Sequence, residues 1–266
     1  MKYQQQVVEA LLANTNIFFI LSTGRSGTQF LSNLLSQIDD RTLVMHEPDF
    51  YYDIGVLEKS KNSKQYASDY INNFRKFSIY DRIDGNEVEG YGEVTGTLRF
   101  HSEALRGVFP NAKIMLMSRD GRDVIRSVMG WPEFYGKESK GAYNLTPQQD
   151  DKYFDKWHDM TRFEKLCWSW QNSNRSMLSL IQPNEIFQFE KIISSYEYFK
   201  TRVLDKLELN VSEQQWTDSV NRKSPNSTKQ YDFPHWADWS ESQKETFMSI
   251  CGPIMEKLDY DLTEIC

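Results

Sequence analysis

Thirteen residues decide the fold that the sequence predicts: Phe18-Phe19-Ile20-Leu21-Ser22-Thr23-Gly24-Arg25-Ser26-Gly27-Thr28-Gln29-Phe30. The first four form the apolar pattern of a buried strand, and the glycines mark a turn that leads into a helix. Gly24 and Gly27 let the backbone come close to an anion, and the free N–H groups of the helix start point at it. Ser26, Thr28 and Arg25 add donors and charge. The turn therefore predicts a phosphate or sulfate site, with an ordinary glycine-serine turn as the alternative.

This turn differs from the standard nucleoside-triphosphate loop, which reads G-x-x-x-x-G-K-[ST]. The residue after Gly27 is Thr28, and the cation stands two positions upstream at Arg25. A nucleotide kinase needs the loop lysine and an acid for magnesium. The lysine is missing, and no clear strand-end aspartate follows the expected pattern. A P-loop nucleotide kinase nevertheless stays open as an alternative.

Composition limits the class of protein. The chain has 266 residues, of which 39% are hydrophobic and 26% charged, as is typical of one soluble globular domain with a real core. The net charge of −7 disfavours nonspecific binding to nucleic acid or to an anionic membrane. A polyanionic ligand must therefore be met by a local basic pocket.

Targeting signals and metal sites are not expected from the sequence. No apolar run is long enough for a membrane span or a signal-peptide core, which predicts a cytoplasmic protein. Cys167, Cys251 and Cys266 lie far apart without C-x-x-C spacing, so neither a disulfide framework nor a zinc site is indicated. We expect no metal, no nucleic-acid partner and no membrane partner, and the oligomeric state stays open.

Strand-like apolar runs and helix-period segments alternate along the chain. The apolar runs end at Leu21, Met45, Val94, Met117 and Phe189. Helix-period segments fall between most of them, an alternation that builds a parallel sheet with helices on both faces. The sequence therefore predicts an α/β fold with a doubly wound parallel sheet, in a single domain over residues 1–266.

The remaining segments predict helices and two irregular regions. Helices are expected near residues 30–38, 121–129, 161–181 and 240–258. Residues 131–159 are aromatic, charged and aperiodic, which predicts an irregular lid or insertion. Residues 221–234 have almost no apolar periodicity and are predicted to form a loop.

An acidic residue follows the second predicted strand, which runs into His46-Glu47-Pro48. Because Pro48 stops regular strand pairing, Glu47 should lie at the carboxyl end of the strand, where open α/β sheets bind their ligands. Strict strand alternation would point His46 and Glu47 in opposite directions.

A second strand-to-helix turn carries another arginine. Arg119 leaves the strand end, and Ser127, eight residues later, lies two turns into the following helix. Both side chains can therefore reach one phosphate. Taken alone, an Arg-Asp pair at a strand end is equally well explained by a surface ion pair or a cap.

Together the two turns resemble those of the PAPS-dependent sulfotransferases, which have a P-loop-like α/β fold. Gly24-Arg25-Ser26-Gly27-Thr28 resembles the family's 5′-phosphosulfate loop, and Arg119 with Ser127 resembles its 3′-phosphate pair. The resemblance covers roughly residues 16–226. It implies transfer of a sulfuryl group from 3′-phosphoadenosine 5′-phosphosulfate (PAPS) to an acceptor hydroxyl or amine without a metal. The product would be adenosine 3′,5′-bisphosphate.

The same resemblance implies further donor-binding residues. Gln29 takes a position that is often threonine in the family. Phe30 stands where many relatives carry a tryptophan that stacks on adenine, although a core position explains a phenylalanine there at least as well. Arg222 and Lys223 loosely resemble the late loop that closes on the 3′-phosphate.

Glu47 is the expected general base. It lies 22 residues after Arg25, close to the spacing of the glutamate base in tyrosylprotein-type relatives. Cytosolic small-molecule enzymes of the family instead place a lysine and a histidine just after the third strand, and residues 93–97 contain neither. Arg25 is therefore the expected electrostatic stabiliser, and His46 stays open as a second acid or base.

The acceptor is left open by the sequence. Acidic composition and a glutamate base favour a small-molecule natural product with an alcohol or amine group. A guanidinium alkaloid, a peptide tyrosine and a glycan are the alternatives, and O- and N-sulfation are not distinguished. A module that binds an adenine nucleotide without catalysis also fits the motifs.

Overall fold

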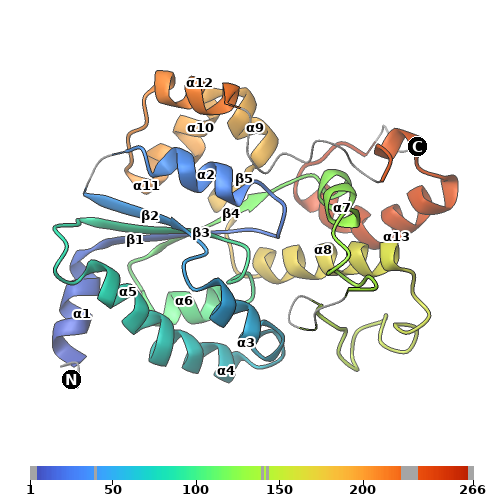
Figure 1. Ribbon diagram of the computed structural model, residues 1–266, viewed down its shortest axis with the longest axis horizontal. Coiled ribbons are helices and arrows are strands. Elements are labelled where there is room, and N and C mark those ends of the chain that lie inside the picture. Colours follow the sequence, from blue (N-terminus) through green and yellow to red (C-terminus); the bar gives the residue numbers. More distant parts are fainter. Residues whose placement is uncertain (1–4, 39–40, 139–140, 142–143, 223–232, 263–266) are drawn as a thin grey trace.

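The computed structural model describes residues 5–38, 41–138, 141, 144–222 and 233–262. Its centre is a five-stranded parallel sheet in the order β2-β3-β1-β4-β5 (Figure 1). The strands are β1 (Asn16–Leu21), β2 (Thr42–His46), β3 (Gly90–Thr95), β4 (Lys113–Ser118) and β5 (Ile186–Gln188). The predicted α/β fold with a parallel sheet is thus confirmed.

The strand order places both predicted anion-binding turns at the carboxyl ends of neighbouring central strands. From β1 the chain first builds β2 and β3 on one side and then crosses to β4 and β5 on the other. In open α/β sheets, ligands bind outside the carboxyl ends of the strands where the order reverses. Both predicted anion-binding turns follow the two strands at this point, β1 and β4.

Helices cover both faces of the sheet because both faces of β1 are apolar. Phe19 and Leu21 enter one hydrophobic core, whereas Phe18 and Ile20 enter a second core on the opposite face. The first core is covered by α1 (Gln5–Asn14), α3 (Phe50–Asn62), α4 (Lys64–Tyr70), α5 (Lys76–Ile83) and α6 (Ser102–Val108) (Figure 1). The second is covered by α2 (Thr28–Leu35), α9 (Phe189–Ser194), α10 (Tyr196–Phe199), α11 (Asp205–Leu207) and α12 (Glu213–Asn221).

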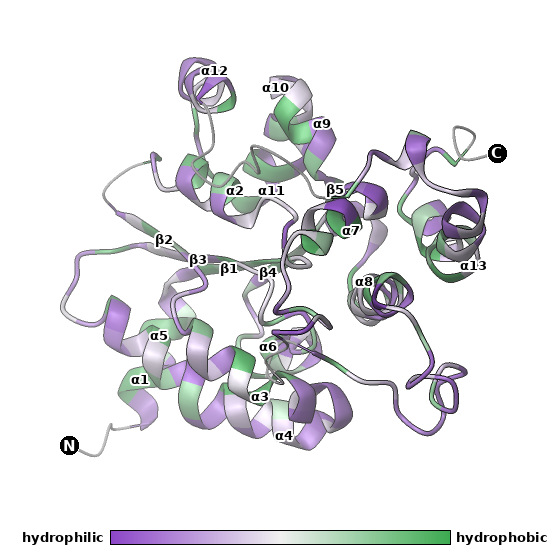
Figure 2. Ribbon diagram, turned by 45° about the vertical axis from the view of Figure 1, so that its right-hand side comes forward, coloured by the Kyte–Doolittle hydropathy of each residue, from purple (hydrophilic) through white to green (hydrophobic). Residues whose placement is uncertain are grey.

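Three further helices form a group beside β4 and β5. Helix α8 (Arg162–Leu178) packs against both α7 (Gly121–Met129) and α13 (Glu241–Lys257). The shorter pieces are π-helical turns at Ile71–Arg75 and Lys200–Leu204 and 3-10 turns at Pro183–Glu185 and Trp236–Asp238. Many of the helices combine green hydrophobic and purple hydrophilic residues, as helices with one buried side do (Figure 2). No helix in the described ranges combines the length and apolarity that crossing a bilayer requires.

Most predicted elements have the expected positions, with one shift at the last strand. β5 ends at Gln188, because Phe189 already begins α9. The described residues of 131–159 contain no regular helix or strand beyond single turns. Trp157 of this segment lies 4.9 Å from Trp168 of α8, centroid to centroid, so the segment packs onto the group of helices around α8.

Candidate active site

The first predicted turn joins the end of β1 to the start of α2. Arg25 and Gly27 have positive φ angles of 67° and 90°. The hydroxyl groups of Thr23 and Ser26 lie 2.7 Å apart and tie the two ends of the turn together. Within the described chain, no side chain caps α2 at Gly27, so its first N–H groups remain available to a ligand. This geometry suits an anionic group.

Phe189 explains why glycine is needed at position 27. A Cβ atom on Gly27 would lie only 2.2 Å from the Phe189 ring, and the positive φ angle disfavours any other residue. The ring of Phe30 meets that of Phe189 edge-on at a centroid distance of 5.9 Å. The aromatic pair therefore forms a wall beside the turn.

The second predicted turn lies against the first. Arg119 follows β4, and its Nη1 donates to the backbone carbonyl of Arg25 at 2.8 Å. Arg25 in turn donates from Nε to Oγ of Ser127 in α7 at 3.1 Å. The Nε of Arg119 is buried without a hydrogen-bond partner among the described residues. Residues from two distant parts of the sequence thus converge, and Arg119 keeps an unused hydrogen-bond donor among the described residues.

Glu47 and His46 face the same space, which corrects the expectation that they point in opposite directions. Glu47 has a φ angle of 45°, so strand alternation ends at His46. Oε1 of Glu47 accepts a hydrogen bond from the backbone N–H of Gly96 at 2.9 Å. Nε2 of His46 lies 2.9 Å from Oγ1 of Thr28 and 4.0 Å from Oε2 of Glu47.

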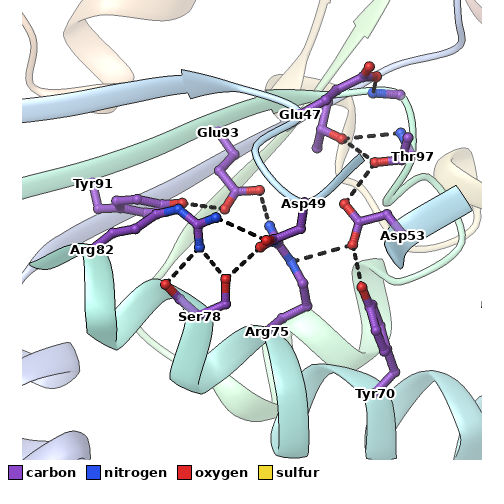
Figure 3. A network of polar contacts seen from close by, with 12 residues as sticks. Glu47, Asp49, Asp53, Tyr70, Arg75, Ser78, Arg82, Tyr91, Glu93 and Thr97 are labelled. Carbon is purple, nitrogen blue, oxygen red and sulfur yellow. Dashed lines mark hydrogen bonds and ion pairs between the residues drawn. The ribbon is translucent and has the colours of Figure 1, made fainter. Parts of the chain in front are cut away.

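A network of buried charges lies behind Glu47 (Figure 3). Arg75 is fully buried and forms ion pairs with Asp49, Asp53 and Glu93. Arg82 is a second cation of the network, and its Nη2 lies 2.9 Å from Oδ1 of Asp49. Because three carboxylates share two guanidinium groups, the network has one acid in excess.

The fold strongly perturbs the ionisation of Asp53, a carboxylate of this network. Burial raises its pKa to about 7, and the charge of Glu93 adds to the shift. Arg75 lies 3.6 Å away but is shared with two other acids, so it does not offset the burial. The hydroxyl of Thr97 donates to Asp53 at 2.9 Å, and Thr97 directly follows Gly96, the residue that binds Glu47.

The two turns, together with His46 and Glu47, line one cavity of 590 Å³. The predicted residues on its wall are Gly24, Arg25, Gly27, Thr28, Gln29, Phe30, His46, Glu47, Arg119 and Ser127. The guanidinium of Arg25 lies over the ring of Trp131 at 4.9 Å, so the segment predicted as a lid reaches the cavity. Ser26 is fully buried within the turn, where its hydrogen bond with Thr23 stabilises the turn conformation.

Of the two late-loop cations that the resemblance implies, the structure describes Arg222. Arg222 is exposed at the end of α12, and it is not among the described residues that line the cavity. Lys223 and most of the predicted loop 221–234 lie outside the described residues.

Two wall residues were missed by the sequence analysis as site residues. Arg99 follows β3 by four residues, and a cation just beyond the carboxyl end of a strand is a signal that could have found it. Phe189 was noted only as the end of an apolar run, and nothing in its local sequence indicates its contact with Gly27.

Comparisons with known proteins give structural similarity only. The sequence matches no protein-family model and no curated protein sequence. The sulfotransferase domain from the curacin biosynthetic pathway is 15% identical over 93% of this chain and 99% of its own, with a TM-score of 0.51. A sulfotransferase from Alicyclobacillus acidocaldarius is 15% identical over 93% of this chain and 97% of its own, with a TM-score of 0.52.

A third solved structure agrees with these two. Sulfotransferase STF9 from Mycobacterium avium is 13% identical over 97% of this chain and 80% of its own, with a TM-score of 0.55. The similarity spans nearly the whole chain in each case, and the α/β architecture is shared. The chain therefore has the fold of the sulfotransferases.

Proposed function

We propose that this protein is a sulfotransferase that uses PAPS as its donor and a small molecule, such as a natural-product alcohol or amine, as its acceptor. The observation that carries the proposal is the contact of Arg25 with Ser127 in one cavity. It joins the two motifs that resemble the two ends of a PAPS site, and Glu47 lies on the same wall.

The donor set of the cavity fits an adenosine bisphosphate with a sulfuryl group. The glycine turn and the start of α2 would hold the 5′-phosphosulfate, and the free donor of Arg119 with Ser127 would hold the 3′-phosphate. Phe30 is half-buried beside Phe189 on the wall and offers an aromatic surface to the adenine.

Glu47 is the group best suited to take the acceptor's proton. Its Oε1 is held by Gly96, while Oε2 lies on the side of His46. When bound, the donor supplies the sulfuryl group, whose sulfur bonds to the acceptor as the bond to the 5′-phosphate breaks in line. Arg25 would stabilise charge on the departing bisphosphate, and His46 remains the second acid-base candidate.

Two other functions make different demands on the same cavity. A P-loop kinase would need a cation like the missing loop lysine and a magnesium ligand. A binding module without catalysis would have no use for a carboxylate beside the anion turn. Glu47 on the cavity wall favours an enzyme over such a module.

Thermal unfolding with three ligands tests the proposal. Adenosine 3′,5′-bisphosphate should stabilise the protein without magnesium, by about 2.7 kcal/mol at 100 times its Kd. ATP and NAD should give much smaller shifts at the same concentration. A magnesium-dependent shift with ATP that equals the bisphosphate shift would contradict the proposal and favour a kinase.

A further inference from the structure

Arg99 is a buried cation on the wall of the same cavity, and the proposed transfer does not use it. Its side chain is held by two neutral groups. Nη1 donates to the carbonyl of Gly96 at 2.6 Å, and Nε donates to Oγ of Ser173 at 3.1 Å. The residue is only 9% exposed.

Arg99 has no ion pair with any carboxylate in the described part of the chain, where every other deeply buried arginine has one. Arg75 pairs with three acids, and Arg122 pairs with Asp120 at 2.6 Å. Burial lowers the pKa of Arg99 to about 10, which leaves the guanidinium charged at neutral pH. A buried charge is costly unless it is paired.

The surroundings of Arg99 also supply little negative charge. Glu47 is the carboxylate whose field reaches Arg99, yet the two groups form no ion pair in the described part of the chain. Glu133, the other carboxylate on the wall, lies in the field of Arg162. Much of the remaining wall is apolar, formed by Phe50, Ile54, Val124, Val128, Phe134 and Leu166. In such a wall a guanidinium attracts an anionic group strongly.

The backbone of Gly96 sets the distance between Arg99 and Glu47. Its N–H binds Glu47, and its carbonyl binds Arg99. An acceptor whose hydroxyl reaches Glu47 therefore finds a guanidinium within the reach of a small molecule. The fork of a guanidinium matches the two oxygens of a carboxylate.

We propose that Arg99 binds a carboxylate of the acceptor, so that the preferred acceptors are small hydroxy acids. The inference rests on the proposed sulfotransferase function and names its substrate class. It disfavours a cationic guanidinium acceptor, because such a group would face Arg99.

Matched acceptor pairs test this inference. Purified protein is given PAPS and salicylate, mandelate or 4-hydroxyphenylacetate, each beside its methyl ester, with phenol and agmatine as neutral and cationic acceptors. For at least one pair, kcat/KM should be about 10- to 100-fold higher for the acid than for the ester, as a charged hydrogen-bonded pair predicts. Arg99→Met should bring that ratio close to one, and Arg99→Lys should keep part of it.

Controls separate the two proposals. Arg41→Met removes an exposed arginine that precedes β2, pairs with Glu89 and is not among the described residues that line the cavity, so it should leave the ratio unchanged. Bisphosphate binding is measured on every variant to show an intact donor site. The role of Arg99 would be overturned if acids and esters were sulfated at equal rates, or if only phenol or agmatine were sulfated. Either result would leave the proposed sulfotransfer standing. Sulfation of none of these acceptors, together with no bisphosphate binding, would overturn both.

If Arg99→Met fails to fold, the acid-to-ester ratio of the unmodified protein and of Arg99→Lys still decides the question. A ratio near one in the unmodified protein overturns the inference. Bisphosphate binding without sulfation of any acid overturns the inference as well, because hydroxy acids are then not acceptors.

Discussion

The Nε atom of Arg25 donates a hydrogen bond to Oγ of Ser127 at 3.1 Å, although the two residues are 102 positions apart in the sequence. Arg119 supports the contact by donating to the carbonyl of Arg25. The turn after β1 and the turn after β4 therefore form one continuous surface of hydrogen-bond donors. Substitutions in this surface should have non-additive effects on the binding free energy of the PAPS donor.

The 3′-phosphate role of Arg119 makes a prediction about ligand discrimination. Arg119→Ala should weaken binding of adenosine 3′,5′-bisphosphate by about 1.5–3 kcal/mol, because a charge-assisted hydrogen bond is lost. Binding of 5′-AMP should change much less. Calorimetric titration of both ligands checks this, with Ser127→Ala as a second variant. An equal loss for both ligands would show that Arg119 does not contact the 3′-phosphate.

The two glycines of the first turn should differ sharply in how much stability the protein loses when each is replaced by alanine. Gly27→Ala should lower the free energy of unfolding by about 1–3 kcal/mol and abolish bisphosphate binding, because the methyl group meets the Phe189 ring at a positive φ angle. Gly24→Ala is the matched control, since a Cβ atom there has nothing within 4 Å and should change stability by less than about 0.5 kcal/mol. Equal denaturation midpoints for the two variants would contradict this account of the turn.

Asp53 should make stability depend on pH. Its pKa is 3.8 without the fold and about 7 within it, so between these values the folded protein holds a proton that the unfolded chain releases. The Asp53 contribution to the free energy of unfolding is therefore full below pH 3.8 and falls by up to about 1.4 kcal/mol per pH unit until pH 7.

Asp53→Asn removes this titration. Urea unfolding at several pH values should show that the protein loses stability relative to Asp53→Asn as pH rises from 4 to 7. A constant difference across this range would mean that Asp53 is ionised throughout, as a true partner of Arg75.

The roles of Glu47 and His46 can be separated by two variants of similar shape. Glu47→Gln should keep the hydrogen bond from Gly96 and the bisphosphate affinity, yet lower kcat by about 10²–10⁴, because an amide cannot take a proton. His46→Asn should retain more activity in the same assay. An active Glu47→Gln beside an inactive His46→Asn would move the base to His46.

Periodicity and motif spacing predicted the sheet and the two turns because these depend on local patterns. Leu21, Thr28 and Arg119 lie where alternation, helix starts and strand ends place them. The direction of the Glu47 side chain could not be predicted, since a φ angle of 45° after a strand follows from tertiary contacts such as that with Gly96.

Contacts between segments that are distant in the chain could not be predicted from the sequence either. Phe189 is adjacent to Gly27 only after α9 is placed beside the turn. Arg75 meets its acids only after α3, the π-helical turn Ile71–Arg75 and β3 assemble. Arg99 looks like an ordinary surface charge in the sequence, because its burial depends on Ser173 and the rest of α8.

Sulfuryl transfer itself is the most direct test of the account. PAPS labelled in its sulfuryl group is incubated with the protein and the acceptor panel in the presence of EDTA. The account predicts that label appears in an acceptor together with an equal amount of adenosine 3′,5′-bisphosphate, and that EDTA leaves the rate unchanged. Absence of labelled product, combined with magnesium-dependent transfer of the γ-phosphate of ATP to the same panel, would contradict it.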